Sequence, residues 1–130
     1  MSKRLPILLL ASCLLSIHSC SEDKPQGASD AAVSYYQALI NKDYDTFVDG
    51  MQGKKDLPAS YRAQFILLAQ QFADKQISLH NGVDSISVVN TTLNKQEDMA
   101  NVFLRLCYAD STSEEVLVPM VKESDIWLMK

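Results

Sequence analysis

The sequence predicts an α+β domain in which three N-terminal helices pack on the concave face of a curled, four-stranded antiparallel meander sheet. Two observations carry this prediction. Apolar residues recur at helical spacing from about residue 29 to residue 75, and after Asn81-Gly82 they alternate at strand spacing. Hydrophobic residues make up 47% and charged residues 22% of the 130 residues, which is the composition of a single globular domain.

The first two helices are set by caps and breakers. Ser29 or Asp30 can cap the first helix, which ends at Asn41-Lys42-Asp43. The second helix is short, is expected to be capped by Asp43 and stops at the glycines at positions 50 and 53.

The third helix is the longest. Pro58 suits its first turn, where a missing N–H costs nothing, and the helical spacing continues to about Lys75. Its apolar residues form a wide stripe, so we expect this helix to be the most buried of the three; the stripe is Tyr61, Phe65, Leu68 and Phe72.

Four strands follow the helices. In the first, Ile86, Val88 and Thr92 are expected on one face, with Val89 and Leu93 on the other. Met99 to Tyr108 is the clearest strand, because Ala100, Val102, Leu104, Leu106 and Tyr108 alternate with polar or mixed residues. Turns at 94–98, 110–113 and 123–125 separate it from strands at 115–122 and 126–130, and Pro119 indicates an edge or a bulge.

The chain opens with a secretory signal. Met1-Ser2-Lys3-Arg4 is basic, and the apolar run from Leu5 to Ile17 is about thirteen residues long, against roughly 20 for a bilayer-spanning helix. Ile17-His18-Ser19-Cys20 resembles a bacterial lipobox, and the resemblance implies cleavage before Cys20 and a palmitate-bearing lipid on its thiol. Leu10-Ala11-Ser12-Cys13 is the alternative, but it would leave an apolar core of about seven residues. Cleavage without lipid stays open.

Three segments follow from this leader: a signal peptide at residues 1–19, a lipidated Cys20 and tether at 20–28, and one domain at 29–130. Loss of the leader takes two of the 12 basic residues and none of the 16 acidic ones, so the side-chain charge goes from −4 to −6. An acidic domain whose longest basic run is Lys54-Lys55 is not expected to bind nucleic acid.

The composition also bears on cofactors. With three cysteines and four glycines, the chain offers neither a multi-cysteine zinc site nor a Gly-rich phosphate loop, and we expect no metal and no cofactor. Cys107 would be the one unmodified cysteine of the mature chain, and we expect it to act as a small buried hydrophobe.

Several phrases resemble a known superfamily. A first helix, then Asn41-Lys42-Asp43-Tyr44-Asp45, then a second and a long third helix is how the cone-shaped nuclear transport factor 2-like (cystatin-like) superfamily begins. Met99-Ala100-Asn101-Val102, the Val118–Glu123 segment and Ile126-Trp127-Leu128 look like the terminal hairpins of its small bacterial lipoproteins, which include domains of unknown function and lumazine-binding-like members. The resemblance covers residues 29–130 and implies a fold, because members include enzymes, carriers and uncharacterised lipoproteins.

The candidate site residues are few. Arg105 interrupts an apolar strand; facing into the cone, it would hold an anionic ligand together with Tyr36, whereas on the outer face it is a surface charge, which we favour. His80 and Asp84, four residues apart, could form an acid–base pair, but their place beside Asn81-Gly82 favours an exposed loop. No catalytic residue is assigned.

These observations favour a non-enzymatic, membrane-anchored envelope lipoprotein that binds a partner protein, itself or a small ligand. We expect an outer-membrane location, on the periplasmic or surface face, and a homodimer through the sheet as one form of self-association. The alternatives are a small-ligand carrier with its pocket in the cone and an isomerase- or dehydratase-like enzyme.

Overall fold

The computed structural model describes residues 25–130. The predicted signal peptide at 1–19, the lipidation candidates Cys13 and Cys20, and most of the predicted tether lie outside the described residues.

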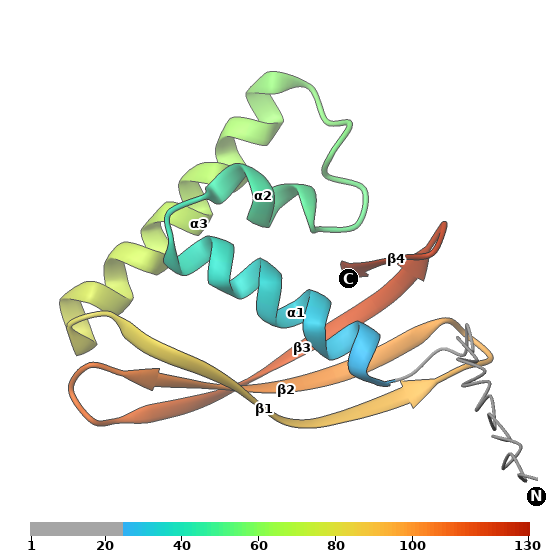
Figure 1. Ribbon diagram of the computed structural model, residues 1–130. Coiled ribbons are helices and arrows are strands. Elements are labelled where there is room, and N and C mark those ends of the chain that lie inside the picture. The colour runs from blue at the N-terminus through green and yellow to red at the C-terminus, as the bar shows by residue number, and fades with distance from the viewer. Residues whose placement is uncertain (1–24) are drawn as a thin grey trace, which may run out of the picture.

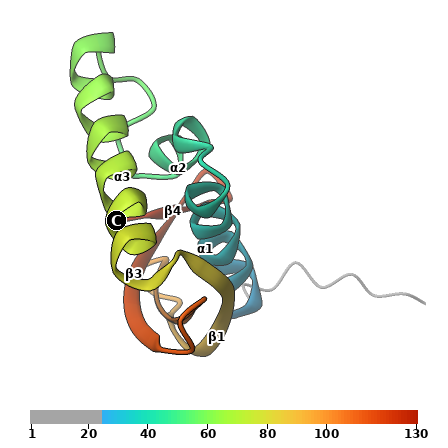
Figure 2. The same ribbon diagram turned by 90° about the vertical axis from the view of Figure 1, so that its left-hand side faces the viewer.

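Four antiparallel strands form one sheet in chain order. They are β1 (Val83–Asn94), β2 (Met99–Tyr108), β3 (Ser113–Glu123) and β4 (Ile126–Met129). The helices are α1 (Pro25–Ile40), α2 (Tyr44–Asp49) and α3 (Ala59–His80), and all three lie on one side of the sheet (Figure 1). Figure 2 shows the strands curling beneath them. The predicted α+β architecture is therefore confirmed, with the sheet as an open meander rather than a closed barrel.

Strand β2 supplies the floor of the core, and its alternation is the one predicted. Its inward side chains are at most 4% exposed because α1 covers them; they are Ala100, Val102, Leu104, Leu106 and Tyr108. Each intervening residue points to the outer face of the sheet. Fully burying one such aliphatic side chain is worth about 1.5–3 kcal/mol, so this strand is a major source of stability.

Strand β1 departs from the predicted faces. Ile86 and Val88 pair with Leu106 and Leu104 and share their inner face, but the register then shifts between Val88 and Asn90. This β-bulge adds one residue and reverses the alternation beyond it. Thr91 and Leu93 therefore face inward and Thr92 faces outward, so the predicted faces of Thr92 and Leu93 were wrong.

Pro119 lies in β3, which has β2 on one side and β4 on the other. It pairs with Asn101 without a register shift, so it marks no bulge in the β2–β3 ladder. The pairing with β4 begins only at Met120, and the Lys130 N–H donates to the Pro119 carbonyl at 2.9 Å. Because a strand residue directs its nitrogen and its carbonyl to the same side, the missing donor faces the place where β4 ends.

Helix α1 begins at Pro25, several residues before the predicted caps Ser29 and Asp30. Ala28 is fully buried, and a Cβ added to Gly27 would lie 3.3 Å from the Trp127 indole nitrogen. Contact with Trp127 therefore stabilises helical structure at residues 25–28, which the sequence analysis assigned to the tether. The Tyr35 hydroxyl also donates to the Trp127 carbonyl at 2.7 Å, which fixes α1 to β4.

Helix α2 has the predicted cap. The Asp43 carboxylate accepts from the Thr46 N–H at 3.3 Å and from the Thr46 hydroxyl at 2.7 Å. Arg62 of α3 then reaches back to α2, with its guanidinium 3.1 Å from Asp45 and 2.6 Å from Asp49. These ion pairs orient α3 relative to α2.

Helix α3 is longer and far less buried than predicted. It continues to His80 and ends at Asn81, whose φ of 61° is the left-handed conformation of a helix C-terminus. Its buried residues are Ala69 and Gln76, whereas Tyr61 is 57%, Leu68 60% and Phe72 39% exposed. The expectation that this stripe forms the core was therefore wrong. Small side chains, Ala69 and Ala73, face the other elements instead and allow a close approach.

Candidate functional site

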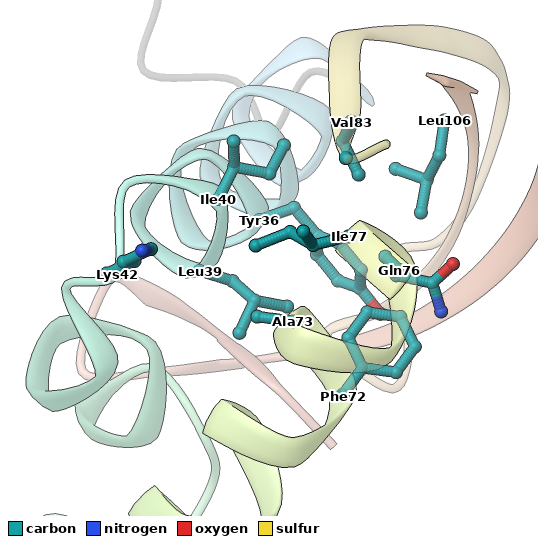
Figure 3. A pocket seen from close by; sticks show the side chains of 11 residues that line it. Tyr36, Leu39, Ile40, Lys42, Phe72, Ala73, Gln76, Ile77, Val83 and Leu106 are labelled. Atoms are coloured by element: carbon teal, nitrogen blue, oxygen red, sulfur yellow. The ribbon is translucent and has the colours of Figure 1, made fainter. Parts of the chain in front are cut away.

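A small cavity lies inside the cone formed by residues 25–130, between α1, the C-terminal half of α3 and the start of β1. Its volume is about 40 Å³. Figure 3 shows the side chains converging on it, almost all of them apolar: Tyr36, Leu39, Ile40, Lys42, Phe72, Ala73, Gln76, Ile77, Val83 and Leu106. Pockets for small organic ligands typically occupy about 300–1,000 Å³, so this space accommodates water rather than a metabolite.

Tyr36 is the one sequence-predicted site residue that lines this cavity. Its ring meets Phe47 edge-on, with centroids 5.7 Å apart and planes at 87°. Burial raises the pKa of the Tyr36 hydroxyl, because the phenolate would lose its hydration. The side chain therefore remains a neutral phenol at physiological pH, and its ring serves as core.

Arg105 lies elsewhere. It sits between the inward-facing Leu104 and Leu106, so strand alternation directs its side chain to the outer face of the sheet. There it pairs with Glu115 across β2 and β3 at 3.0 Å, with the two side chains 46% and 52% exposed. The structure thus does not bring Arg105 and Tyr36 to one site, and an exposed pair of this kind contributes little to stability.

Larger hollows are present, but they are open to solvent. One of about 320 Å³ lies at the mouth of the cone, between the loop after α2 and the C-terminal half of the sheet; its lining includes Phe47, Lys54, Leu117 and Lys130. Another, of about 530 Å³, runs along the outside of α1 past Gln37. Neither collects a set of side chains with complementary catalytic roles.

A polar cluster that the sequence did not predict lies at the C-terminal end of α3. His80 Nδ1 is 2.9 Å from the Asp110 carboxylate, and the imidazole stacks on Tyr108 with centroids 4.0 Å apart. The Tyr108 hydroxyl donates to Glu114 at 2.7 Å. His80 therefore partners Asp110 rather than Asp84, which is exposed, and the cluster fastens α3 to the β2–β3 turn.

The geometry of this cluster suits a structural contact rather than a catalytic relay. The Thr112 hydroxyl donates to Asp110 and lies 3.3 Å from His80 Nδ1, the same nitrogen that faces the carboxylate. A nucleophile–base–orienter relay needs its outer members on opposite ring nitrogens, so Thr112 is not placed as a nucleophile. Sequence spacing offers no signal for a contact across 30 residues.

Acidic pH should weaken this cluster. Hydrogen bonds from the Thr112 hydroxyl, from His80 and from the Thr112 N–H lower the pKa of Asp110 from 3.8 to about 2. A depressed pKa stabilises the fold above the unfolded-state value and ceases to do so as pH falls through the folded-state value. We therefore expect the stability difference between the natural protein and Asp110→Asn to be constant at neutral pH and to shrink from about pH 4 to pH 2. Urea unfolding of both proteins across that range measures it; a difference independent of pH would contradict the assignment.

Two further properties of residues 25–130 bear on function. No three His, Cys, Asp or Glu side chains among residues 25–130 are grouped closely enough to hold a metal ion. Within the same residues, no helix has both the length and the apolar character needed to cross a bilayer.

Comparison with known proteins identifies the fold. No protein-family model matches the sequence, and no curated protein matches it. Among solved structures, a protein from Campylobacter jejuni named an NTF2-like (nuclear transport factor 2-like) transpeptidase superposes with a TM-score of 0.65. The match covers 82% of this chain and 97% of that one at 17% sequence identity. A likeness at this identity establishes an NTF2-like fold and leaves the activity open.

Proposed function

We propose that the chain is a lipoprotein of the bacterial envelope, lipidated on Cys20, and that its folded domain is a non-enzymatic binding and interaction module. The proposal rests on one observation: the interior of the cone is filled, and apolar side chains are exposed on the surface of the domain. The cone interior is filled by side chains such as Leu104, Leu106 and Met120, each at most 1% exposed. Large apolar side chains on α3 are instead open to solvent, which is typical of a surface that meets another macromolecule.

The alternatives receive less support. A carrier needs a chamber, and the enclosed space is about 40 Å³. A transpeptidase of the kind named for the structural neighbour needs a nucleophile activated by a base. Cys107 lies on the outer face of the sheet, paired with Ser85 and Ser113, while His80 is engaged with Asp110. Neither chemistry has a site built for it among residues 25–130.

The membrane anchor rests on the Ile17-His18-Ser19-Cys20 sequence. A diacylated and N-acylated cysteine carries enough apolar chain for stable membrane attachment. In this proposal the attachment is to the outer membrane. We expect Cys20→Ala to abolish metabolic palmitate labelling and to release the protein from membranes into the soluble fraction. Cys13→Ala is the matched control and should label normally. Labelling that survives Cys20→Ala and is lost in Cys13→Ala would move the modification to Cys13. A natural chain that incorporates no palmitate would overturn the anchor.

A further inference from the structure

Helix α3 carries an apolar seam with coiled-coil spacing. Its positions are separated by four, three, four, three and four residues, which is the heptad pattern of a and d sites; they are Tyr61, Phe65, Leu68, Phe72, Lys75 and Leu79. Leu68 is 60% and Leu79 58% exposed. The α3 seam, defined by these six residues, runs along about five turns of helix. Most of its side chains are exposed, whereas Phe65 is half-buried and Phe72 also borders the cone cavity.

The α3 seam is distinct from the face that α3 turns toward its own domain. That face contains Ala69, Gln76 and Arg62, which repeat every seven residues and pack on α1 and α2 or pair with α2. At 100° per residue the two stripes lie roughly a quarter-turn apart on the helix. Within residues 25–130 the seam is covered only in part, because Lys54 lies over Phe65 and Phe72 borders the cone cavity. Tyr61, Leu68 and Leu79 are 57%, 60% and 58% exposed, although side chains of this kind are ordinarily buried.

We infer that the α3 seam binds the α3 seam of a second copy of this chain, in an antiparallel two-helix packing. The register is self-complementary. With the twofold axis level with residue 70, Leu68 meets Phe72 of the other copy, Phe65 meets Lys75, and Tyr61 meets Leu79. Every a position then faces a d position, which is how antiparallel coiled coils form their core layers.

The charges on the helix agree with this arrangement. The chain is acidic overall, yet no seam position holds an acid, and the flanking positions 64, 71 and 78 are Gln, Gln and Ser. Two copies can therefore approach without like charges in contact. The one charged seam residue, Lys75, comes opposite Phe65, where an ammonium over an aromatic ring is favourable. Lys54 of the same chain already lies over this ring, with its Nζ 4.8 Å from the centroid, so Lys75 of the second copy would have to approach the opposite face of the ring.

The outer face of the sheet, the surface predicted from sequence for a homodimer, suits self-association less well. It carries the Arg105–Glu115 ion pair and a row of exposed polar side chains on β1 and β2, namely Ser85, Ser87, Asn90, Thr92 and Asn101. The same face also carries Phe103, Leu117, Val121 and Leu128 on β2 to β4. Burying the face against a second sheet would therefore gain apolar area but would cost desolvation free energy for the ion pair and the polar row. The α3 seam carries a single charged side chain, Lys75, so its desolvation cost is smaller.

Substitutions at neighbouring positions test the seam. The protein is expressed from its full sequence, so that the leader is processed naturally, and is purified in a mild detergent. Its association is followed by sedimentation over a range of concentrations. Leu68→Glu places a charge beside the twofold axis and should raise the dimer dissociation constant at least about tenfold. Leu67→Glu is the matched control, because Leu67 is 53% exposed on the same helix but lies off the seam. Equal association of the two variants, or a monomer at all concentrations of the natural chain, would overturn the inference.

Cysteine cross-linking tests the register independently, in a Cys107→Ser background. Gln71 lies next to its own copy across the twofold axis, so Gln71→Cys should form a disulfide-linked dimer on mild oxidation. Gln64 and Ser78 lie seven residues before and after it, so Gln64→Cys should fail to link to itself and should link to Ser78→Cys when the two are co-expressed. Self-linking of Gln64→Cys would indicate parallel helices, and dimers of the natural chain linked through Cys107 would indicate contact through the sheet. A Cys20 without lipid would itself be a free thiol, so each link is assigned to its cysteines by peptide mapping. Either result overturns the inference.

Discussion

Replacing Gly50 by alanine is expected to destabilise the domain by about 3 kcal/mol, at the upper end of what overpacking costs in a well-packed core. Gly50 follows α2 with φ of −75°, a conformation open to any residue, so backbone strain is not the reason. A Cβ here would lie 2.8 Å from Cγ of Tyr35 and closer still to two other ring carbons. The Tyr35 ring cannot withdraw without losing its hydrogen bond to the Trp127 carbonyl. Urea unfolding of the purified variant measures the loss.

The cause can be separated from a general intolerance of the loop. In a Tyr35→Ala background the obstructing ring is gone, and Gly50→Ala should then cost less than about 1 kcal/mol, a coupling that a double-mutant cycle detects. Gly53→Ala is a second control, because a Cβ there meets nothing within 4 Å and only the φ of 73° opposes it. A Gly50→Ala cost that is the same with and without the Tyr35 ring would contradict this explanation.

Trp127→Ala is expected to have a comparable or larger effect, about 3–5 kcal/mol, which is typical of truncating a buried aromatic residue. Trp127 is 8% exposed and packs where the first turns of α1 meet the last strand. Its loss would leave a cavity beneath Ala28 and Gly27 and would weaken the packing of α1 on β4. Since single domains have only about 5–15 kcal/mol of stability, the variant should unfold well below the natural protein's midpoint.

Thermal and urea unfolding of Trp127→Ala, with Trp127→Phe as the matched control, measure this effect. Phenylalanine keeps most of the apolar volume and should lose less than half as much stability. If Trp127→Ala cost less than about 1 kcal/mol, the contact between α1 and β4 would not hold the domain together as described.

The parts of the fold that follow from local periodicity could be predicted. Strand β2 alternates without interruption, because it pairs on both sides and buries one whole face, and its faces are those predicted. The cap of α2 was predicted because an aspartate before a helix satisfies local amides with its own side chain.

The parts that depend on contacts between elements could not be predicted. The bulge near Val89 reverses the faces of β1 without a sequence signal such as glycine. On α3 two stripes compete for the interior, one with aromatic residues and one with alanines. Arg62 pairs with α2 and the alanines allow close packing, so the less hydrophobic stripe faces inward. Hydropathy alone favours the opposite choice.

The candidate site residues also differ in whether local spacing or contacts between elements determine their positions. Tyr36 lies on the buried stripe of α1, so its place in the interior follows from helical spacing. Whether Arg105 faced the cone depended on which face of β2 the helices cover, and that is a property of the assembled fold. The partnership of His80 with Asp110 joins the end of a helix to a distant turn, and no local pattern encodes it.

Our central claim is that the interior of the cone is a packed hydrophobic core, not a ligand chamber, and that the domain binds partners through its outer surface. Native mass spectrometry of the full chain, purified from its own host, tests this most directly. The account predicts the mass of the covalently modified chain, or twice that mass, with no additional species lost on denaturation. A small-molecule mass that survives purification and disappears when the protein is denatured would contradict it, because a retained ligand requires a chamber that the filled interior does not provide.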